Sequence, residues 1–261
     1  MESNDCLALR ERAMELARQH VPPPAQATIF TADGDARHAA DQYFLSSGEA
    51  IRCFFEKDAF DGIGRLRADA HLCLNKLGHA MHDLDPVFDA FSRTPAIATV
   101  AQDIGMEEPL LLQSMYIFKQ ARIGGEVVCH TDHTYLWTEP PSVVGFWFAI
   151  DDATTENGCM WALPGGHRLP VRSRSRLNAS HTATEIELFD PAPYPTEGLL
   201  SLEASRGTLI LLDGALPHRS GPNQSDMPRH AYTLHAINGT ASYLPDNWLQ
   251  RPNLSLRGFS G

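Results

Sequence analysis

The chain lacks the features by which several classes of protein are known from sequence. No apolar run approaches the roughly 18 residues that a membrane-spanning helix needs. Residues 1–20 mix acids and bases with apolar positions, unlike a secretory signal. Basic residues are few, since 21 Lys and Arg face 32 Asp and Glu and leave a net charge of −11. Such a surface repels phosphates, so we expect neither nucleic acid nor a membrane as a partner.

Cysteine is scarce, and its spacing suggests no pairing. The chain has five cysteines, an odd number, and no Cys-x-x-Cys motif. A disulfide framework and a structural zinc site are therefore both unexpected. We expect a reducing, cytoplasmic environment in which each cysteine is a small buried apolar side chain. The cysteines are Cys6, Cys53, Cys73, Cys129 and Cys159.

The sequence shows no internal repeat and no domain linker. Its 261 residues, of which 43% are hydrophobic, can bury one large core. We therefore expect a single domain over residues 1–261. Residues 1–105 are predicted to be mostly helical support, and residues 106–245 to form the main core.

Two segments of the first part have the marks of helices. Near the N-terminus, apolar residues recur at helical spacing, and Asn4 or Asp5 is placed to cap the helix. In "SRTPAIATVAQDIG", Thr94 is a candidate cap, Pro95 occupies the first turn and Gly105 follows the last turn.

After residue 105 the sequence pattern changes to short runs of aliphatic and aromatic residues, which predict strands. Asn157-Gly158 predicts a hairpin turn between two of them. Residues 168–195 are polar, contain "RSRSR" and predict a long irregular loop, functional or mobile. Helices followed by many strands favour a mainly β fold, a sandwich or cupin-like jelly roll with a layer of N-terminal helices. The predicted strands are "LLLQSMYIF", "VVGFWFAI", "GTLILL" and "AYTLHAI".

The segment "VVCHTDHTYLW" contains His130, Thr131 and Asp132. About one His-x-Asp is expected by chance in such a chain, so the tripeptide alone is weak. A second element strengthens it, because a predicted strand leads into His218, and Arg229 follows eleven residues later. Two histidines and one carboxylate are the ligands of non-haem Fe(II) oxygenases. A guanidinium such as that of Arg229 can hold the far carboxylate of 2-oxoglutarate in a bidentate fork.

Five blocks, in order, resemble the phytanoyl-CoA dioxygenase family of Fe(II)/2-oxoglutarate oxygenases, and within it the phytanoyl-CoA dioxygenase domain-containing protein 1 group. The resemblance extends from about Tyr43 to about Arg251. The family fold is a double-stranded β-helix, which agrees with the strand pattern above. The blocks are "DQYFLSSGEAIRCFFEK", "LNKLGHAMHDLDPVF", "LLQSMYIFKQARIGGEVVCHTDHTYLWTEP", "GFWFAIDDATTENGCMWALPGGH" and "SDMPRHAYTLHAINGTASYLPDNWLQRP".

The resemblance implies a set of site residues. Iron ligation falls to His130, Asp132 and His218. Contacts with the far carboxylate of 2-oxoglutarate fall to Arg229 and Ser220. Three further residues match positions that line the co-substrate site: Lys76, Met115 and Trp147.

Some residues depart from the family pattern or have simpler roles. His133 stands where small residues are common, and its place beside a ligand could bias substrate choice. His167 of "LPGGH" is expected to tie down a loop, and His235 to be a satisfied polar group on a strand. The arginines of "RSRSR" are expected to be solvated, with the grip of an anionic substrate as the alternative.

The sequence thus predicts an oxygenase that uses Fe(II), O₂ and 2-oxoglutarate as co-substrate. It would hydroxylate a small organic or acyl-type substrate and release succinate and CO₂. One alternative is an inactive jelly roll that binds a small carboxylate as a sensor or scaffold. A second is a cupin-type metal enzyme without 2-oxoglutarate, against which Arg229 and Lys76 count.

Overall fold

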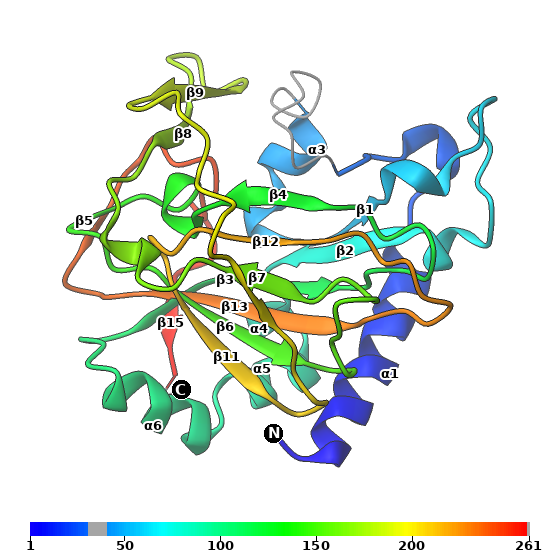
Figure 1. Cartoon of the computed structure of the whole chain (residues 1–261), viewed down its shortest axis with the longest axis horizontal. Coiled ribbons are helices and arrows are strands. Elements are labelled where there is room, and N and C mark those ends of the chain that lie inside the picture. Colours follow the sequence, from blue (N-terminus) through cyan, green and yellow to red (C-terminus); the bar gives the residue numbers. More distant parts are fainter. Residues whose placement is uncertain (31–40, 260–261) are drawn as a thin grey trace.

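The computed structural model describes residues 1–30 and 41–259, and two antiparallel sheets lie at its centre (Figure 1). The larger sheet has seven strands in the order β1-β2-β3-β13-β6-β11, with β15 beside β3, and the smaller has the order β10-β7-β12-β4. The predicted mainly β jelly roll, a double-stranded β-helix, is confirmed. The larger sheet comprises β1 (Ile51–Phe55), β2 (Leu74–His79), β3 (Leu110–Ile117), β6 (Val144–Ala149), β11 (Leu209–Asp213), β13 (Ala231–Ile237) and β15 (Arg257–Gly258). The smaller comprises β4 (Val127–His130), β7 (Met160–Ala162), β10 (Leu200–Leu202) and β12 (His218–Ser220).

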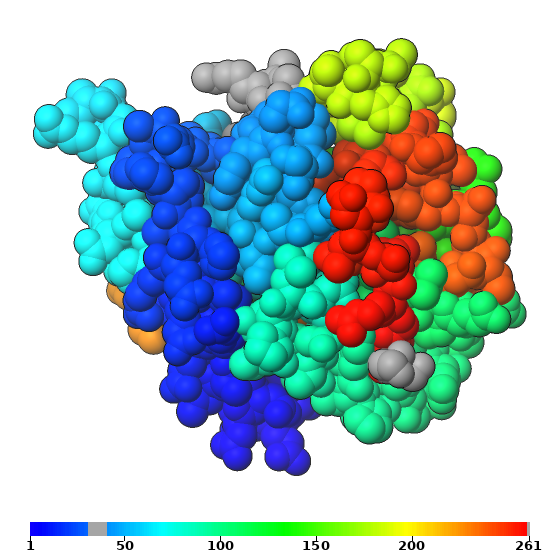
Figure 2. Space-filling model, turned by 180° about the vertical axis from the view of Figure 1, so that it is seen from behind, coloured from blue at the N-terminus to red at the C-terminus, as the bar shows by residue number. Residues whose placement is uncertain are grey.

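Helices cover the outer face of the larger sheet, as Figures 1 and 2 show for α1, α5 and α6. Their buried residues join those of the larger sheet in one apolar core. Within the described ranges, no helix is long and apolar enough to cross a membrane. The α-helices are α1 (Ser3–His20), α3 (Gln42–Leu45), α4 (Met81–Leu84), α5 (Pro86–Ser92) and α6 (Pro95–Asp103). The short 3₁₀ turns are η1 (Pro24–Gln26), η2 (Ser47–Glu49), η3 (Lys57–Ala59), η4 (Ala70–Leu72), η5 (Asp132–Thr134) and η6 (Gly166–Arg168).

The helix ends differ in detail from the predicted caps. The residue before α1 is Glu2, and Asp5 lies in the first turn and accepts a hydrogen bond from the Glu2 amide at 3.0 Å. Helix α6 begins at Pro95, but the side chain of Thr94 makes no capping hydrogen bond. Gly105 has a φ of +80°, the left-handed conformation that suits a residue after a helix.

Residues 1–105 contain more than helices. Strands β1 and β2 pair with each other, and β2 pairs with β3, so this segment supplies one edge of the larger sheet. The sequence did not predict these strands, because "LNKLGH" shows neither a clear apolar run nor alternation. The division at residue 105 is therefore not a division between helical support and sheet.

Strand β13 shows how the larger sheet packs against the helices on one face and lines a pocket on the other. All seven of its residues are buried, and they alternate between the two faces. Tyr232, Leu234 and Ala236 join the core beneath the helices. Thr233 and His235 face the other way and line a pocket between the sheets.

The turn at Asn157-Gly158 does not form a hairpin, so that prediction was wrong. Strand β6 before it pairs with β11 and β13, whereas β7 after it pairs with β10 and β12. The turn thus carries the chain from the larger sheet to the smaller. Gly158 has a φ of +82°, which accounts for a glycine at this point.

Residues 168–195 had been predicted to form one long irregular loop, but part of this segment is regular. They contain a hairpin of β8 (Ser173–Leu177) and β9 (Thr184–Leu188), with a register of Ser175 opposite Ile186. A further short pair joins β5 (Thr138–Glu139) and β14 (Ser242–Tyr243). The hairpin rises at one end of the molecule (Figure 1).

The arginines of this hairpin have partners within the chain. Arg172 donates to the carbonyl of Pro193 at 2.7 Å, and Arg174 pairs with Asp246. Arg176 lies 3.3 Å from Glu185 across the hairpin. These contacts favour a structural role for the arginines over the grip of an anionic substrate.

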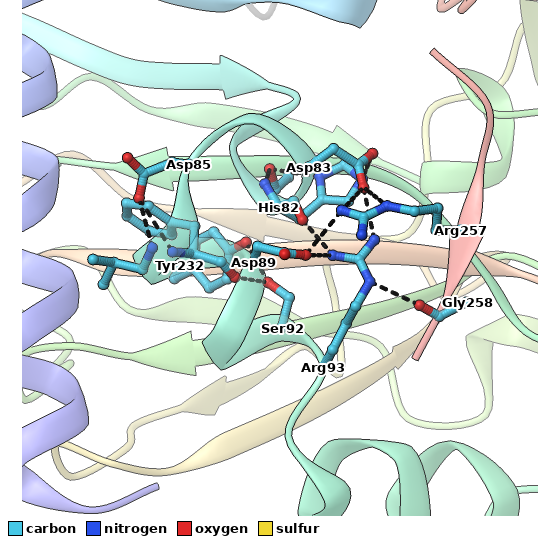
Figure 3. Close-up of polar contacts among 12 residues, drawn as sticks. His82, Asp83, Asp85, Asp89, Ser92, Arg93, Tyr232, Arg257 and Gly258 are labelled. Atoms are coloured by element: carbon cyan, nitrogen blue, oxygen red, sulfur yellow. Dashed lines mark hydrogen bonds and ion pairs between the residues drawn. The ribbon is translucent and has the colours of Figure 1, made fainter. Parts of the chain in front are cut away.

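A cluster of buried charges fastens the C-terminal segment to the helical layer (Figure 3). The side chain of Asp83 is 1% exposed and pairs with Arg93, Arg251 and Arg257. Burial raises the pKa of Asp83, but His82 and Arg251 outweigh it and hold that pKa below its ordinary value. Three cations thus converge on one carboxylate that has little contact with water.

We expect Asp83→Asn to lower the free energy of unfolding by roughly 3–5 kcal/mol, because it leaves buried guanidinium groups without their counter-charge. Urea denaturation at pH 7 measures this change. Asp226→Asn, which breaks the exposed pair with Arg122, is the control and should have little effect. The contribution of Asp83 should be complete above about pH 4 and lost as the pH falls, since its folded pKa is lowered. Equal stability of the two variants at pH 7 would contradict this role of Asp83.

Candidate functional site

Three potential metal ligands meet where the smaller sheet faces the larger. Strand β4 ends at His130, strand β12 begins at His218, and the pairing sets these two residues opposite each other. Their ring centroids lie 4.4 Å apart. Each Nε2 lies 3.7 Å from Oδ1 of Asp132, the first residue of η5. The ligand atoms of the three residues all lie within 4.8 Å of one another, so they could hold one metal ion.

Hydrogen bonds orient both imidazoles. Nδ1 of His130 lies 2.8 Å from the carbonyl of Val128, and Nδ1 of His218 lies 2.9 Å from that of Leu216. A carbonyl can only accept, so each Nδ1 carries the proton and each Nε2 presents its lone pair. Burial, followed by the charge of His218, lowers the pKa of His130 to about 4. His130 is therefore neutral at pH 7, as a metal ligand must be.

Two residues behind Asp132 fix its direction. Nε2 of Gln113 lies 3.1 Å from Nδ1 of His235, and Nε2 of His235 lies 3.2 Å from Oδ2 of Asp132. An amide nitrogen can only donate, so the proton of His235 is on Nε2 and points at the carboxylate. Oδ1 of Asp132 is left to face the two histidines. Gly145 makes room, since a Cβ there would lie 3.2 Å from Oδ2 of Asp132.

The neighbours of Asp132 keep it ionised. Burial alone raises the pKa of this carboxyl. The charges of His235 and His218 and the hydrogen bond from His235 outweigh burial and hold the pKa below its ordinary value. The group is thus a carboxylate at neutral pH, the form that binds a metal ion.

The three residues lie in a cavity that opens to solvent, and Arg229 lies in its wall. Arg229 is 2% exposed. Its Nη2 donates to the carbonyl of Gly158 at 2.8 Å, and its guanidinium lies over the ring of Trp147 at 5.5 Å. Nε and Nη1 have no hydrogen-bond partner among the described residues. Burial lowers its pKa to about 10, so the group is charged at pH 7. Two free donors on one planar cation fit a carboxylate.

Every residue that the sequence singled out for the site lines this cavity. Lys76 is buried, which lowers its pKa to about 7. Its Nζ lies 3.6 Å from Sδ of Met115 and 3.6 Å from the centroid of the Phe30 ring. The predicted residues in the wall are Lys76, Met115, His130, Asp132, Trp147, His218, Ser220 and Arg229.

Two histidines lie outside the cavity wall. The ring of His133 is buried and packs against that of Trp137, with centroids 4.3 Å apart. His133 does not line this cavity, because η5 turns the chain immediately after Asp132, and this counts against a bias on substrate choice. His167 is exposed in η6 and is not among the potential metal ligands.

The sequence did not indicate the supporting residues of the site. His235 had been interpreted as a satisfied polar group, yet it contacts the carboxylate of Asp132. Neither Lys119 nor Gly158 was predicted to be part of the site, yet Lys119 lines the cavity and the carbonyl of Gly158 accepts a hydrogen bond from Arg229. The alternation of Thr233 and His235 along a predicted strand was the one available signal, since it places both on one face.

The chain is similar to known proteins over most of its length. The sequence profile of the family described as phytanoyl-CoA dioxygenase (PhyH) matches residues 2–231. A phytanoyl-CoA dioxygenase of Arabidopsis thaliana is 39% identical over 249 residues, which cover 94% of this chain and 85% of that protein. Phytanoyl-CoA dioxygenase domain-containing protein 1 of Mus musculus is 39% identical over 256 residues, covering 95% of this chain and 87% of that protein.

Solved structures are similar in fold at lower identity. EctD from S. alaskensis, with 2-oxoglutarate and 5-hydroxyectoine, has a TM-score of 0.55 and 19% identity over 92% of this chain and 90% of that one. SnoK, a non-heme alpha ketoglutarate dependent carbocyclase, has a TM-score of 0.58 and 16% identity over 90% of this chain and 86% of that one. With the profile match and the relatives above, the chain belongs to the phytanoyl-CoA dioxygenase family of 2-oxoglutarate-dependent oxygenases.

Proposed function

We propose that this protein uses Fe(II), O₂ and 2-oxoglutarate to hydroxylate a small organic or acyl-type substrate. One observation carries the proposal: two imidazoles, a carboxylate and a buried arginine with two free donor atoms share one cavity. The five free cysteines support the further proposal of a reducing, cytoplasmic setting.

In this proposal, His130, Asp132 and His218 would hold the metal ion through Nε2, Oδ1 and Nε2, and the co-substrate and O₂ would complete its set of ligands. When bound, iron with 2-oxoglutarate and O₂ supplies the oxidation of a C–H bond, with release of succinate and CO₂.

The protein's own residues orient the co-substrate and exclude water. Arg229 would donate to the far carboxylate from Nε and Nη1, and its place over the ring of Trp147 keeps the guanidinium from turning. Apolar side chains such as those of Phe146 and Leu212 line the cavity near the ligands and limit the access of water.

The proposal is tested by calorimetric titration of the protein with Fe(II) without oxygen, then with 2-oxoglutarate, and by a screen for succinate release over candidate substrates. We expect binding of both, and turnover with a substrate of the stated class. Binding of 2-oxoglutarate with no succinate from any substrate would favour the sensor or scaffold. Metal binding with no affinity for 2-oxoglutarate would favour the cupin-type enzyme.

We expect His130→Ala and His218→Ala each to abolish detectable Fe(II) binding at micromolar metal, because two remaining ligands hold the ion poorly. Calorimetry measures the affinity, and circular dichroism checks that the fold is kept. The exposed His167→Ala is the matched control and should bind as the unmodified protein does. Native metal affinity in either ligand variant would overturn the assignment.

His235→Leu should weaken metal binding roughly 10- to 100-fold, because Asp132 loses the donor that directs its carboxylate. His235→Gln keeps an N–H donor and should recover part of the affinity. The dissociation constant for Fe(II) or Mn(II) measures both effects. If Leu and Gln at this position bound metal equally well, a positioning role for His235 would be excluded.

Arg229→Lys should weaken binding of 2-oxoglutarate to the metal-loaded protein roughly 10- to 100-fold. A point charge replaces a planar fork and loses one charge-assisted hydrogen bond, worth about 1.5–3 kcal/mol. Arg229→Met should bind still more weakly. The affinity for the metal alone should not change and is the control. Unaltered 2-oxoglutarate affinity in Arg229→Met would place the anchor at another residue, with Lys76 the first candidate.

A further inference from the structure

Lys119 is a buried cation in the cavity to which the proposed function assigns no role. The chain has only three lysines, of which Lys57 is exposed and Lys76 and Lys119 line the cavity. Lys119 is 2% exposed and lies two residues after the end of β3. Its Nζ donates to the carbonyl of Gly125 and, at 3.0 Å, to Oγ of Ser220.

The backbone of Lys119 is tied to that of Arg229. The carbonyl of Lys119 accepts from the amide of Arg229 at 3.1 Å and from Nδ2 of Asn223 at 2.8 Å. Lys119 has a φ of +38°, which an L residue adopts only where its surroundings hold it. The fixed backbone places the side chains of Lys119 and Arg229 in the same wall of the cavity.

Gly158 contacts Arg229 and leaves space for the side chain of Lys119. Its carbonyl accepts from Nη2 of Arg229, and a Cβ at this position would lie 2.7 Å from Cε of Lys119. Any larger residue would displace the lysine side chain. The side chain of Lys119 can therefore extend toward Ser220 only because residue 158 is a glycine.

The contact between Lys119 and Ser220 has a definite direction. An ammonium group has hydrogens to donate and no lone pair, so Oγ of Ser220 must be the acceptor. The hydroxyl hydrogen of Ser220 is then free to serve a different acceptor. Ser220 is 6% exposed and lines the cavity with Arg229, so a carboxylate held by Arg229 is the acceptor within the cavity.

We propose that Lys119 is a positioning residue, which turns the Ser220 hydroxyl into a donor toward the carboxylate anchored by Arg229. This inference rests on the proposed function, since the carboxylate is that of 2-oxoglutarate. Lys119 acts through Ser220, so removing Lys119 costs affinity only while Ser220 is present.

The charges around Lys119 make this role depend on pH. Burial and then the charge of Arg229 lower the pKa of Lys119, the charges of Glu56 and Glu126 oppose them, and the result is about 7. A neutral amine has a lone pair and can accept a hydrogen bond from the Ser220 hydroxyl. The hydroxyl hydrogen then no longer points toward the anion in the cavity. A bound anion favours the ammonium form. Affinity is therefore highest below the pKa and falls as the pH rises through about 7.

The test is a double-mutant cycle on the affinity of the Mn(II)-loaded protein for 2-oxoglutarate, measured by calorimetry. Lys119→Met and Ser220→Ala should each weaken binding roughly 10-fold, the loss of one hydrogen bond to a charged group. The double variant should be no weaker than Ser220→Ala alone. Lys57→Met is the matched control and should bind normally. The proposal would be overturned if the loss of affinity in the double variant equalled the product of the two single losses. Normal binding by Lys119→Met would also overturn it.

A second measurement needs no change at Lys119, in case that variant does not fold. The affinity of the unmodified protein for 2-oxoglutarate should fall between pH 6 and pH 8.5 more steeply than that of Ser220→Ala. Parallel profiles would overturn the role of Lys119. Absence of 2-oxoglutarate binding by the unmodified protein at every pH would instead overturn the proposed function, and the inference with it.

Discussion

The geometry of the site depends on the pairing of two short strands, β4 and β12. This pairing brings His218 beside His130, although a long stretch of chain separates them, and no local preference of either segment could do so. Residues two apart on a strand share a face and lie about 7 Å from each other. His218 and Ser220 of β12 therefore line the same cavity, so one strand provides both a potential metal ligand and the contact proposed for the co-substrate.

The larger sheet supplies the opposite wall and has to satisfy the polar groups that it buries there. Buried polar atoms need hydrogen-bond partners, or they destabilise the fold. Gln113 on β3 and His235 on β13 meet this need in part by forming a chain of contacts that ends at Asp132. Oε1 of Gln113 has no hydrogen-bond partner among the described residues, so the need is not met in full. The contacts of this chain also hold the carboxylate in one direction. Part of the stability of this wall and the preorganisation of the candidate metal site therefore have a common physical origin.

The sequence predicted local patterns better than long-range pairing. Strand β13 coincides with "AYTLHAI" because a short run rich in aliphatic, β-branched and aromatic residues favours a strand. A turn was expected at Asn157-Gly158 and is present, but the expected pairing of its flanking strands was wrong, since a turn signal does not say which strands will pair. The candidate ligands were identified because five blocks of the sequence resemble a known family, whereas the His-x-Asp tripeptide alone was weak. His235 and Lys119 were missed because their roles arise only from the contacts that folding brings together.

The charge of the cavity runs opposite to that of the whole chain. The chain has a net charge of −11, yet Lys76, Lys119 and Arg229 all line the cavity. Burial lowers the pKa of both lysines, and the charge of Arg229 lowers that of Lys119 further, while Glu56 and Glu126 oppose this effect. Low-dielectric walls strengthen the attraction of a buried guanidinium for an anion. A carboxylate held by Arg229 offsets the cost of burying that charge, so the group that destabilises the empty site favours the bound one.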